Sequence, residues 1–196
     1  KELSEPYRPG KLREMSFANI IAMVKEYHSL YGFYSDDLIG DYKRTIEFLQ
    51  KEQREVIEQQ FSSFGNVLYS ELHDFLNHGH EWIAAYDESL ASVHGLDFTD
   101  LICGVHRLFQ DPVVRERWRS RYNYISVDEM QDTGVLEYKV LEMLWEGNHV
   151  LLCGDYFQTI YEWRGSDPFR LLKQFDADFK PLKIIFYENY RSNWTL

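Results

Sequence analysis

The sequence predicts an α/β protein in which a small parallel sheet follows a largely helical first half. Two short apolar runs, residues 124–127 and 149–153, stop abruptly at polar residues. This pattern is typical of parallel strands that are covered on both faces. Between the runs, apolar residues recur at helical spacing, at Val135, Tyr138, Leu141, Leu144 and Trp145. The segment is therefore predicted to form a strand–helix–strand unit.

Two acidic residues, Asp128 and Glu129, directly follow the first of these runs. Ligands of open α/β sheets bind at the carboxyl ends of the strands. Adjacent carboxylates repel each other there unless a divalent cation shares their charge. We therefore expect Asp128 to hold Mg²⁺, with Glu129 nearby to orient or deprotonate an attacking water. A solvated turn is the alternative for such a pair.

The first half of the chain is predicted to be helical. Apolar residues at helical spacing indicate amphipathic helices around residues 17–24, 42–57, 67–76, 82–90 and 98–109. Asp97 is the expected N-cap of the last of these helices, and Asp111-Pro112 is expected to end it. Joints between helices are expected at Tyr31-Gly32, at residues 62–66 and at His78-Gly79-His80.

Three ordered motifs resemble those of the UvrD/Rep family of superfamily 1 DNA helicases. Residues 128–133, Asp-Glu-Met-Gln-Asp-Thr, look like motif II of that family, with Met130 where an aromatic residue is usual. Residues 154–166 look like motif III, and residues 189–192, Asn-Tyr-Arg-Ser, look like motif IV. Residues 96–102 are similar to the segment that leads into motif II. The close resemblance covers about the last half of the chain.

The resemblance implies that the sheet is part of a RecA-like core of the P-loop NTPase type, incomplete in this chain. In the family, a largely helical subdomain is inserted ahead of motif II. Residues 1–95 would then form a mainly helical region, with the insert at about 30–95. Residues 96–196 would form the part of the motor core that carries motifs II, III and IV.

The resemblance also implies ATP hydrolysis, with ATP and Mg²⁺ as cofactors. Asp128 would bind the metal and Glu129 would be the base that activates water. Gln158 would contact the terminal phosphate or the attacking water, and Gln131 would be a second neutral sensor. These roles suit phosphoryl transfer, which needs positioning and charge neutralisation more than covalent chemistry.

Further roles follow from the same motifs. Asp155 would support the Mg²⁺ shell, Tyr190 would stack on the adenine, and Arg191 would act as an arginine finger. Tyr161 and Trp163 would stack on bases of single-stranded DNA, with Arg164 nearby. The implied activity is movement along single-stranded DNA or single/double-strand junctions in DNA repair or recombination.

A phosphate-binding loop that ends in Gly-Lys-Ser/Thr is needed for this chemistry. The sequence contains one Gly-Lys pair, Gly10-Lys11, and Leu12 follows it. The simplest account is a piece of a longer helicase, inactive alone, whose partner is the remainder of the same polypeptide. The alternative is a non-catalytic interaction module derived from the helicase fold. A Gly-Lys-Ser/Thr loop upstream in the parent reading frame would decide between them.

Composition agrees with an intracellular globular protein. The 196 residues are enough to bury a core. The two cysteines, Cys103 and Cys153, lack paired spacing and are expected to be small buried hydrophobes in a reducing cytosol.

No apolar run is long enough to span a bilayer and no basic, apolar leader is present, so we expect a cytoplasmic protein with no membrane partner. The formal net charge of −11 differs from the usual basic surface of nucleic-acid-binding proteins. The resemblance implies a DNA cleft that several domains share, to which this chain would contribute only one wall.

Overall fold

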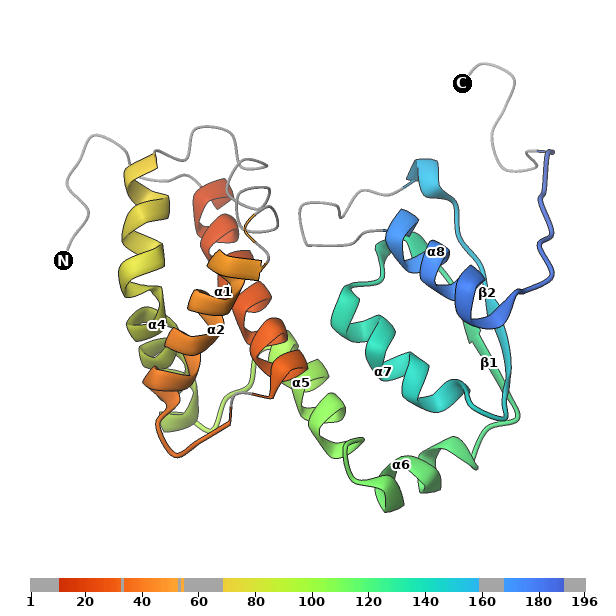
Figure 1. Ribbon diagram of the computed structural model, residues 1–196, viewed down its shortest axis with the longest axis horizontal. Helices are drawn as coiled ribbons and strands as arrows, with labels where there is room; N and C mark the ends of the chain where they lie inside the picture. Colours follow the sequence, from red (N-terminus) through yellow and green to blue (C-terminus); the bar gives the residue numbers. More distant parts are fainter. Residues whose placement is uncertain (1–10, 33, 53, 55–68, 159–167, 189–196) are drawn as a thin grey trace.

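A computed structural model describes residues 11–32, 34–52, 54, 69–158 and 168–188 of the chain. Its first helices are α1 (Lys11–Tyr31), α2 (Leu38–Glu52) and α4 (Tyr69–Ser92), followed by α5 (Phe98–Leu108) and α6 (Pro112–Arg119). The strands β1 (Tyr124–Val127) and β2 (His149–Leu152) flank α7 (Val135–Trp145), and α8 (Pro168–Phe179) comes last. Short 3₁₀ turns, η1 (Met130–Asp132) and η2 (Tyr156–Gln158), follow the strands. Figure 1 shows α1, α2 and α4 side by side, with α5 and α6 leading to the sheet and its helices.

The helices α1, α2 and α4 enclose a shared apolar core. On α2, the buried residues Tyr42, Thr45, Ile46 and Leu49 recur at helical spacing, as the sequence predicts for an amphipathic helix. They pack with residues of the other two helices, including Val24 and Ile83. The face of α2 that packs in the core is therefore the one that carries its apolar residues, and most charged residues of α2 lie on its other faces.

The expected joint at His78-Gly79-His80 is wrong, because α4 runs unbroken through it. Gly79 is buried, and a Cβ there would lie 2.7 Å from ring atoms of Phe75, closer than any real contact. Phe75 is itself part of the apolar core. The glycine makes room for this ring on its own helix, and this packing role outweighs the low helix propensity of glycine.

Other boundaries agree with the predictions from the sequence. The helix α1 ends at Tyr31, and Gly32 follows with a φ of +66°, the left-handed conformation in which glycine commonly ends helices. Asp97 caps α5 in a reciprocal capping box with Asp100. The helix α5 ends at Leu108, shortly before the expected break at Asp111-Pro112, and this pair begins α6, because the Asp111 carboxylate caps that helix. The expected joint at residues 62–66 lies outside the described residues.

The sheet consists of two parallel strands, with Tyr124 paired to His149 and Val127 to Leu152. The helix α7 forms the crossover between them, so the predicted strand–helix–strand unit is confirmed. One face of the sheet packs on a core of Met130, Tyr138, Trp145, Leu171 and Phe175. The chain is thus a largely helical α/β structure with a small parallel sheet.

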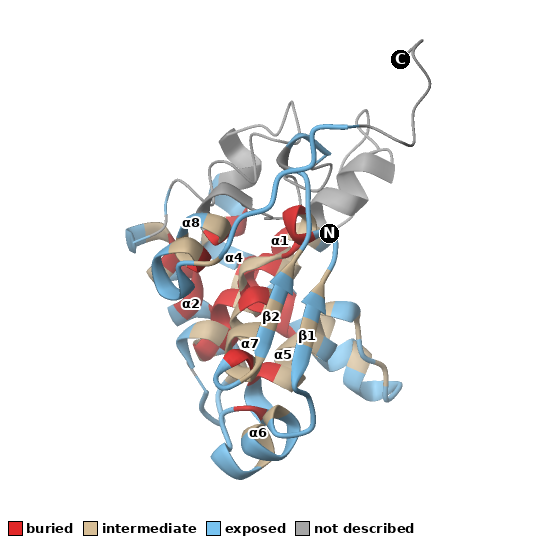
Figure 2. Ribbon diagram, turned by 90° about the vertical axis from the view of Figure 1, so that its right-hand side faces the viewer, coloured by how far each residue is buried: buried red, intermediate tan, exposed pale blue. Residues whose placement is uncertain are grey.

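The second face of the sheet is open among the described residues, contrary to the expected cover on both faces. Tyr124 is 75% exposed and Leu151 is 56% exposed, and Figure 2 shows both strands at the surface. Residues 182–187 lie outside helices and strands, and their apolar members are exposed: Leu182, Ile184, Ile185, Phe186 and Tyr187. Both segments present apolar side chains that this part of the chain does not cover.

A buried cation links α1, α4 and α5. The ammonium of Lys25 lies 2.9 Å from carboxylate oxygens of Asp87 and Asp97 and also contacts Asp100. We call these four residues the Lys25 cluster. Burial alone would lower the pKa of Lys25, but hydrogen bonds to the three carboxylates outweigh this effect and raise the pKa above its ordinary value. The cluster therefore fastens the start of α5 to the helical core.

Two further expectations concern cysteines and the membrane. Cys103 is partly buried, but Cys153 is exposed at the end of β2, so the prediction that both are buried is wrong for Cys153. Within the described ranges, no helix combines the length and the apolar character that crossing a membrane requires.

Candidate functional site at the end of the sheet

The predicted acidic site lies where β1 and β2 leave the sheet. The pairing continues one residue beyond the strands, because the Cys153 amide donates to the Val127 carbonyl at 2.8 Å. The Met130 amide then donates to the Cys153 carbonyl at 2.9 Å. Since parallel strands end at the same edge, the residues after Val127 and those after Cys153 come together there.

The turn after β1 directs Asp128 and Glu129 towards solvent. Glu129 adopts a left-handed backbone, with a φ of 51° and a ψ of 41°, which is uncommon for a residue with a side chain. Met130, the next residue, is buried in the core beneath the sheet. The two carboxylates remain exposed, so the turn separates a core residue from two acids within three positions.

Residues after β2 join the same edge. The Asp155 amide donates to the side-chain oxygen of Gln131 at 3.0 Å. The Asp155 carboxylate accepts hydrogen bonds from the side chain of Gln158 at 2.9 Å and from the Phe157 amide at 3.0 Å. Gln131 also donates to the Glu129 carboxylate at 2.5 Å. The structure thus brings together Glu129, Gln131, Asp155 and Gln158, and Asp128 stands directly before Glu129.

The remaining predicted site residues cannot be placed in this arrangement. Tyr161, Trp163 and Arg164 of the motif III match lie outside the described residues. Tyr190 and Arg191 of the motif IV match also lie outside them. Their roles stay predictions from the sequence.

The donors at this edge suit Mg²⁺ better than a metal that needs a complete protein cage. Asp128 and Glu129 are exposed carboxylates, and Mg²⁺ is usually held by one or two carboxylates together with water and substrate phosphates. Among the described residues, no group of three or more histidine, cysteine and acidic side chains could hold a metal ion. A cation here would therefore depend on a bound phosphate for part of its coordination.

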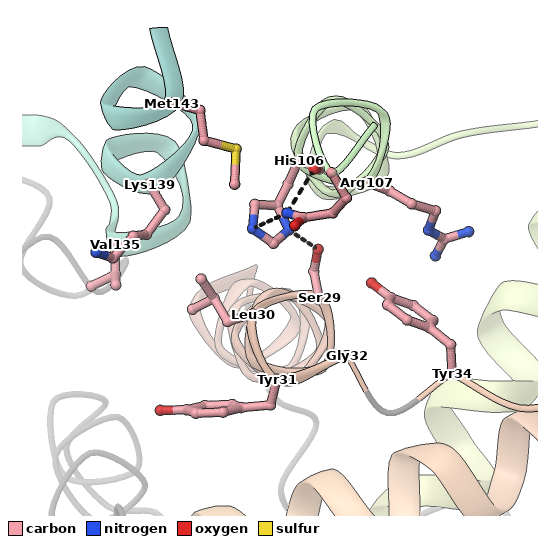
Figure 3. A pocket seen from close by; sticks show the side chains of 11 residues that line it. Ser29, Leu30, Tyr31, Gly32, Tyr34, His106, Arg107, Val135, Lys139 and Met143 are labelled. Atoms are coloured by element: carbon pink, nitrogen blue, oxygen red, sulfur yellow. Dashed lines mark hydrogen bonds between the residues drawn. The ribbon is translucent and has the colours of Figure 1, made fainter. Parts of the chain in front are cut away.

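A separate pocket of about 580 Å³ lies between α1, α5 and α7. Figure 3 shows His106 of α5 above Ser29 of α1, with Lys139 and Met143 of α7 on the facing wall. The Ser29 hydroxyl lies 3.0 Å from Nδ1 of His106, and burial lowers the pKa of this histidine. Sequence reasoning missed this pocket, because its walls come from segments far apart in the chain, and none of the predicted site residues lines it.

Comparison with known proteins agrees with the resemblance in the motifs. The model of the UvrD/REP helicase N-terminal domain family matches residues 11–180. A probable DNA helicase II homolog of Mycoplasma capricolum is 38% identical over 109 residues, which is 55% of this chain and 15% of the relative. DNA helicase II of Haemophilus influenzae is 37% identical over 117 residues, 57% of this chain and 16% of the relative.

A third relative, the ATP-dependent DNA helicase Rep of Buchnera aphidicola, is 43% identical over 100 residues, 50% of this chain and 15% of the relative. The aligned part of the chain therefore spans about one sixth of the length of these relatives. The family match covers most of the chain, from the first described helix to the end of α8. The chain belongs to the UvrD/REP helicase N-terminal domain family.

Proposed function

We propose that this chain is part of an ATP-dependent DNA helicase or translocase, and that the edge carrying Asp128 and Glu129 is its site of ATP hydrolysis. The observation that carries the proposal is the convergence of motif II and the start of motif III at one sheet edge. Glu129 and Gln158 belong to segments 29 positions apart, yet hydrogen bonds through Gln131 and Asp155 connect them. A carboxylate can activate water as a general base, and a neutral amide can orient that water or donate a hydrogen bond to a phosphate.

The proposal gives a role to residues of all three motif matches. Bound Mg²⁺ would neutralise charge on the phosphates, and Asp128 would hold it. Glu129 would accept the proton of the attacking water, because its exposed carboxylate can reach a substrate outside the sheet. Gln158 would donate its amide to the terminal phosphate or the water. Arg191 would stabilise charge on the transferred group, and Tyr190 would stack on the adenine.

The DNA side of the proposal rests on the sequence after Gln158. Tyr161, Trp163 and Arg164 follow within six positions, so a residue that contacts phosphate and residues that contact bases share one short segment. Aromatic faces accept any base, which suits a motor that passes along single-stranded DNA or a junction without reading sequence. The net charge of −11 suits a chain that contributes one wall of a shared cleft. Repair or recombination is the proposed setting.

The proposal also assigns the two parts of this chain to places in a larger motor protein. We infer that residues 96–196 are part of a RecA-like core and that residues 1–95 carry the inserted helical subdomain. The open sheet face, with exposed Tyr124 and Leu151, would be covered by the remainder of the same polypeptide. The short share of the relatives that aligns with this chain supports a larger whole.

Glu129→Gln in the full-length protein tests the proposal. The amide still binds water but cannot accept its proton, so we expect DNA-stimulated ATP hydrolysis to fall by about 10²–10⁴-fold. Nucleotide binding should persist. Glu47→Gln, at an exposed position on α2, is the matched control and should hydrolyse ATP normally. Unchanged hydrolysis in Glu129→Gln would show that Glu129 is not the base. Absence of DNA-stimulated ATP hydrolysis in the unmodified full-length protein would instead favour the non-catalytic interaction module.

A further inference from the structure

Gln131 is a buried amide between two groups of the candidate site. Its side chain donates to the Glu129 carboxylate at 2.5 Å and accepts from the Asp155 backbone amide at 3.0 Å. The residue is only 2% exposed, whereas Glu129 and Asp155 are both exposed. Gln131 therefore connects the exit of β1 to the exit of β2 from below the surface.

The chemistry of the two partners determines the side chain that can stand at this position. A backbone N–H can only donate, so the atom that faces Asp155 must be an acceptor. A carboxylate can only accept, so the atom that faces Glu129 must be a donor. A primary amide provides both at its two ends. A glutamate of the same shape would instead place a second carboxylate against Glu129.

Gly154 provides the space that this arrangement needs. A Cβ at position 154 would lie 2.5 Å from the Gln131 side-chain oxygen and 3.2 Å from the Met130 amide nitrogen. The first of these distances is shorter than real Cβ contacts allow, so any larger residue would displace the amide. The close approach of the chain after β2 and the orientation of Gln131 are thus parts of one arrangement.

The hydrogen bonds continue beyond Asp155 to the proposed phosphate contact. The Asp155 carboxylate accepts from the Gln158 side chain at 2.9 Å. A connected path therefore runs from the Glu129 carboxylate through Gln131 and Asp155 to Gln158. Within the described part of the chain, the hydrogen bond from Gln131 is the one that reaches the Glu129 carboxylate.

We propose that Gln131 is a positioning residue, which holds the Glu129 carboxylate in its reactive orientation and couples it to the Asp155–Gln158 turn. This inference rests on the proposed function, in which Glu129 is the base. Gln131 itself is buried and both ends of its amide are engaged, so it acts through Glu129 and does not touch the nucleotide. This role differs from that of the nucleotide sensor that the motif resemblance suggests.

Two substitutions of similar size test the role in the full-length protein. Gln131→Glu replaces the donor with a repelling oxygen, and Gln131→Met removes both hydrogen bonds. We expect either change to lower the turnover of ATP by about tenfold to a hundredfold, the range in which small misplacements of reacting groups lie. The ATP dissociation constant should stay within about threefold, because Gln131 does not contact nucleotide. Gln50→Glu on α2 is the control for the same chemical change and should match the unmodified protein.

A double-mutant cycle separates positioning from a general structural effect. If Gln131 acts through Glu129, then Gln131→Glu should lower turnover little further in a Glu129→Gln background. Gly154→Ala offers an independent route, because its methyl group displaces the amide, and it should lower turnover while nucleotide affinity persists. Additive losses in the cycle would overturn the proposal. Failure of both Gln131 variants to bind nucleotide would also overturn it, because the role would then be structural.

The same experiments separate this inference from the proposed function. If Glu129→Gln retains full turnover, Glu129 is not the base and both ideas fail. If Glu129→Gln loses turnover while Gln131→Glu and Gly154→Ala keep it, the proposed function stands and the positioning role alone is wrong.

Discussion

Lys25→Met should destabilise the fold strongly, because it removes the single cation of the Lys25 cluster. The Lys25 side chain is 4% exposed, and the side chains of Asp87, Asp97 and Asp100 are each 20–22% exposed. Methionine fills similar apolar space but leaves the carboxylates facing one another. Removal of one partner from a buried ion pair costs about 3–5 kcal/mol. We expect about 3 kcal/mol, the lower end, since one fifth of each carboxylate already reaches water and can regain hydration.

The loss of stability in Lys25→Met should depend on pH, in a direction that follows from the pKa shifts of Asp97 and Lys25. Burial tends to raise the pKa of Asp97, but hydrogen bonds from Lys25 and the Asp100 amide lower it below the ordinary 3.8. A lowered carboxylate pKa stabilises the fold above the unfolded value, and this contribution disappears as the pH falls through the folded value. The raised pKa of Lys25 has the opposite pH dependence. It stabilises the fold fully below the unfolded pKa of 10.5, and this contribution disappears as the pH rises through the folded pKa. The stability gap between Lys25→Met and the unmodified chain should therefore be full near pH 7 and shrink below about pH 4.

Urea unfolding followed by circular dichroism measures this gap at about pH 7 and at about pH 3, below the ordinary carboxylate pKa. Lys43→Met, at an exposed position on α2, controls for the loss of one positive charge and should change stability by less than about 0.5 kcal/mol. Asp97→Asn added to Lys25→Met should recover part of the loss by removing one repelling charge. A loss below about 1 kcal/mol, or an equal loss at about pH 3 and about pH 7, would refute the reasoning that the cation balances the three carboxylates.

Two further predictions concern buried polar groups. The Tyr138 hydroxyl is buried with no hydrogen-bond partner among the described residues, whereas the Tyr42 hydroxyl donates to Asp87. Tyr138→Phe should therefore leave the free energy of unfolding unchanged or raise it, and Tyr42→Phe should lower it by about 1–2 kcal/mol; equal losses in urea unfolding would contradict this contrast. Burial lowers the pKa of His106 below 6.5, so protonation favours the unfolded chain and stability should decline as the pH falls below about 6.5. His106→Gln should decline less between pH 7.5 and pH 5 in the same assay, and an identical decline would exclude a contribution from His106.

The elements that the sequence predicted correctly have local causes. The strand–helix–strand unit follows from two apolar runs and the helical spacing between them, and Asp97 caps α5 through contacts within three residues. Gly79 was misjudged because its meaning depends on Phe75, whose ring occupies the space that a Cβ would need. Composition alone does not distinguish a glycine that ends a helix from one that admits a neighbouring ring.

Some features of the candidate site could likewise be predicted from the sequence, and others could not. Asp128, Glu129 and Asp155 could be assigned to one edge, because parallel strands end on the same side of a sheet. The partners of Gln131 could not be predicted, since they depend on which residue of the turn is buried and on the approach of Gly154. The left-handed backbone of Glu129 has no signal in the sequence either, because glutamate rarely adopts it.

Met130 explains how the turn keeps this uncommon conformation. It stands between Glu129 and Gln131, its side chain lies in the core with Tyr138 and Trp145, and its amide donates to the Cys153 carbonyl. Two anchors of different kinds, apolar packing and a hydrogen bond across the sheet, therefore hold the residue next to the proposed base. The backbone position of Glu129 is thus held by the core and the second strand before any ligand binds, and the Gln131 amide then contacts its carboxylate; preorganised groups of this kind need no rearrangement at the moment of reaction.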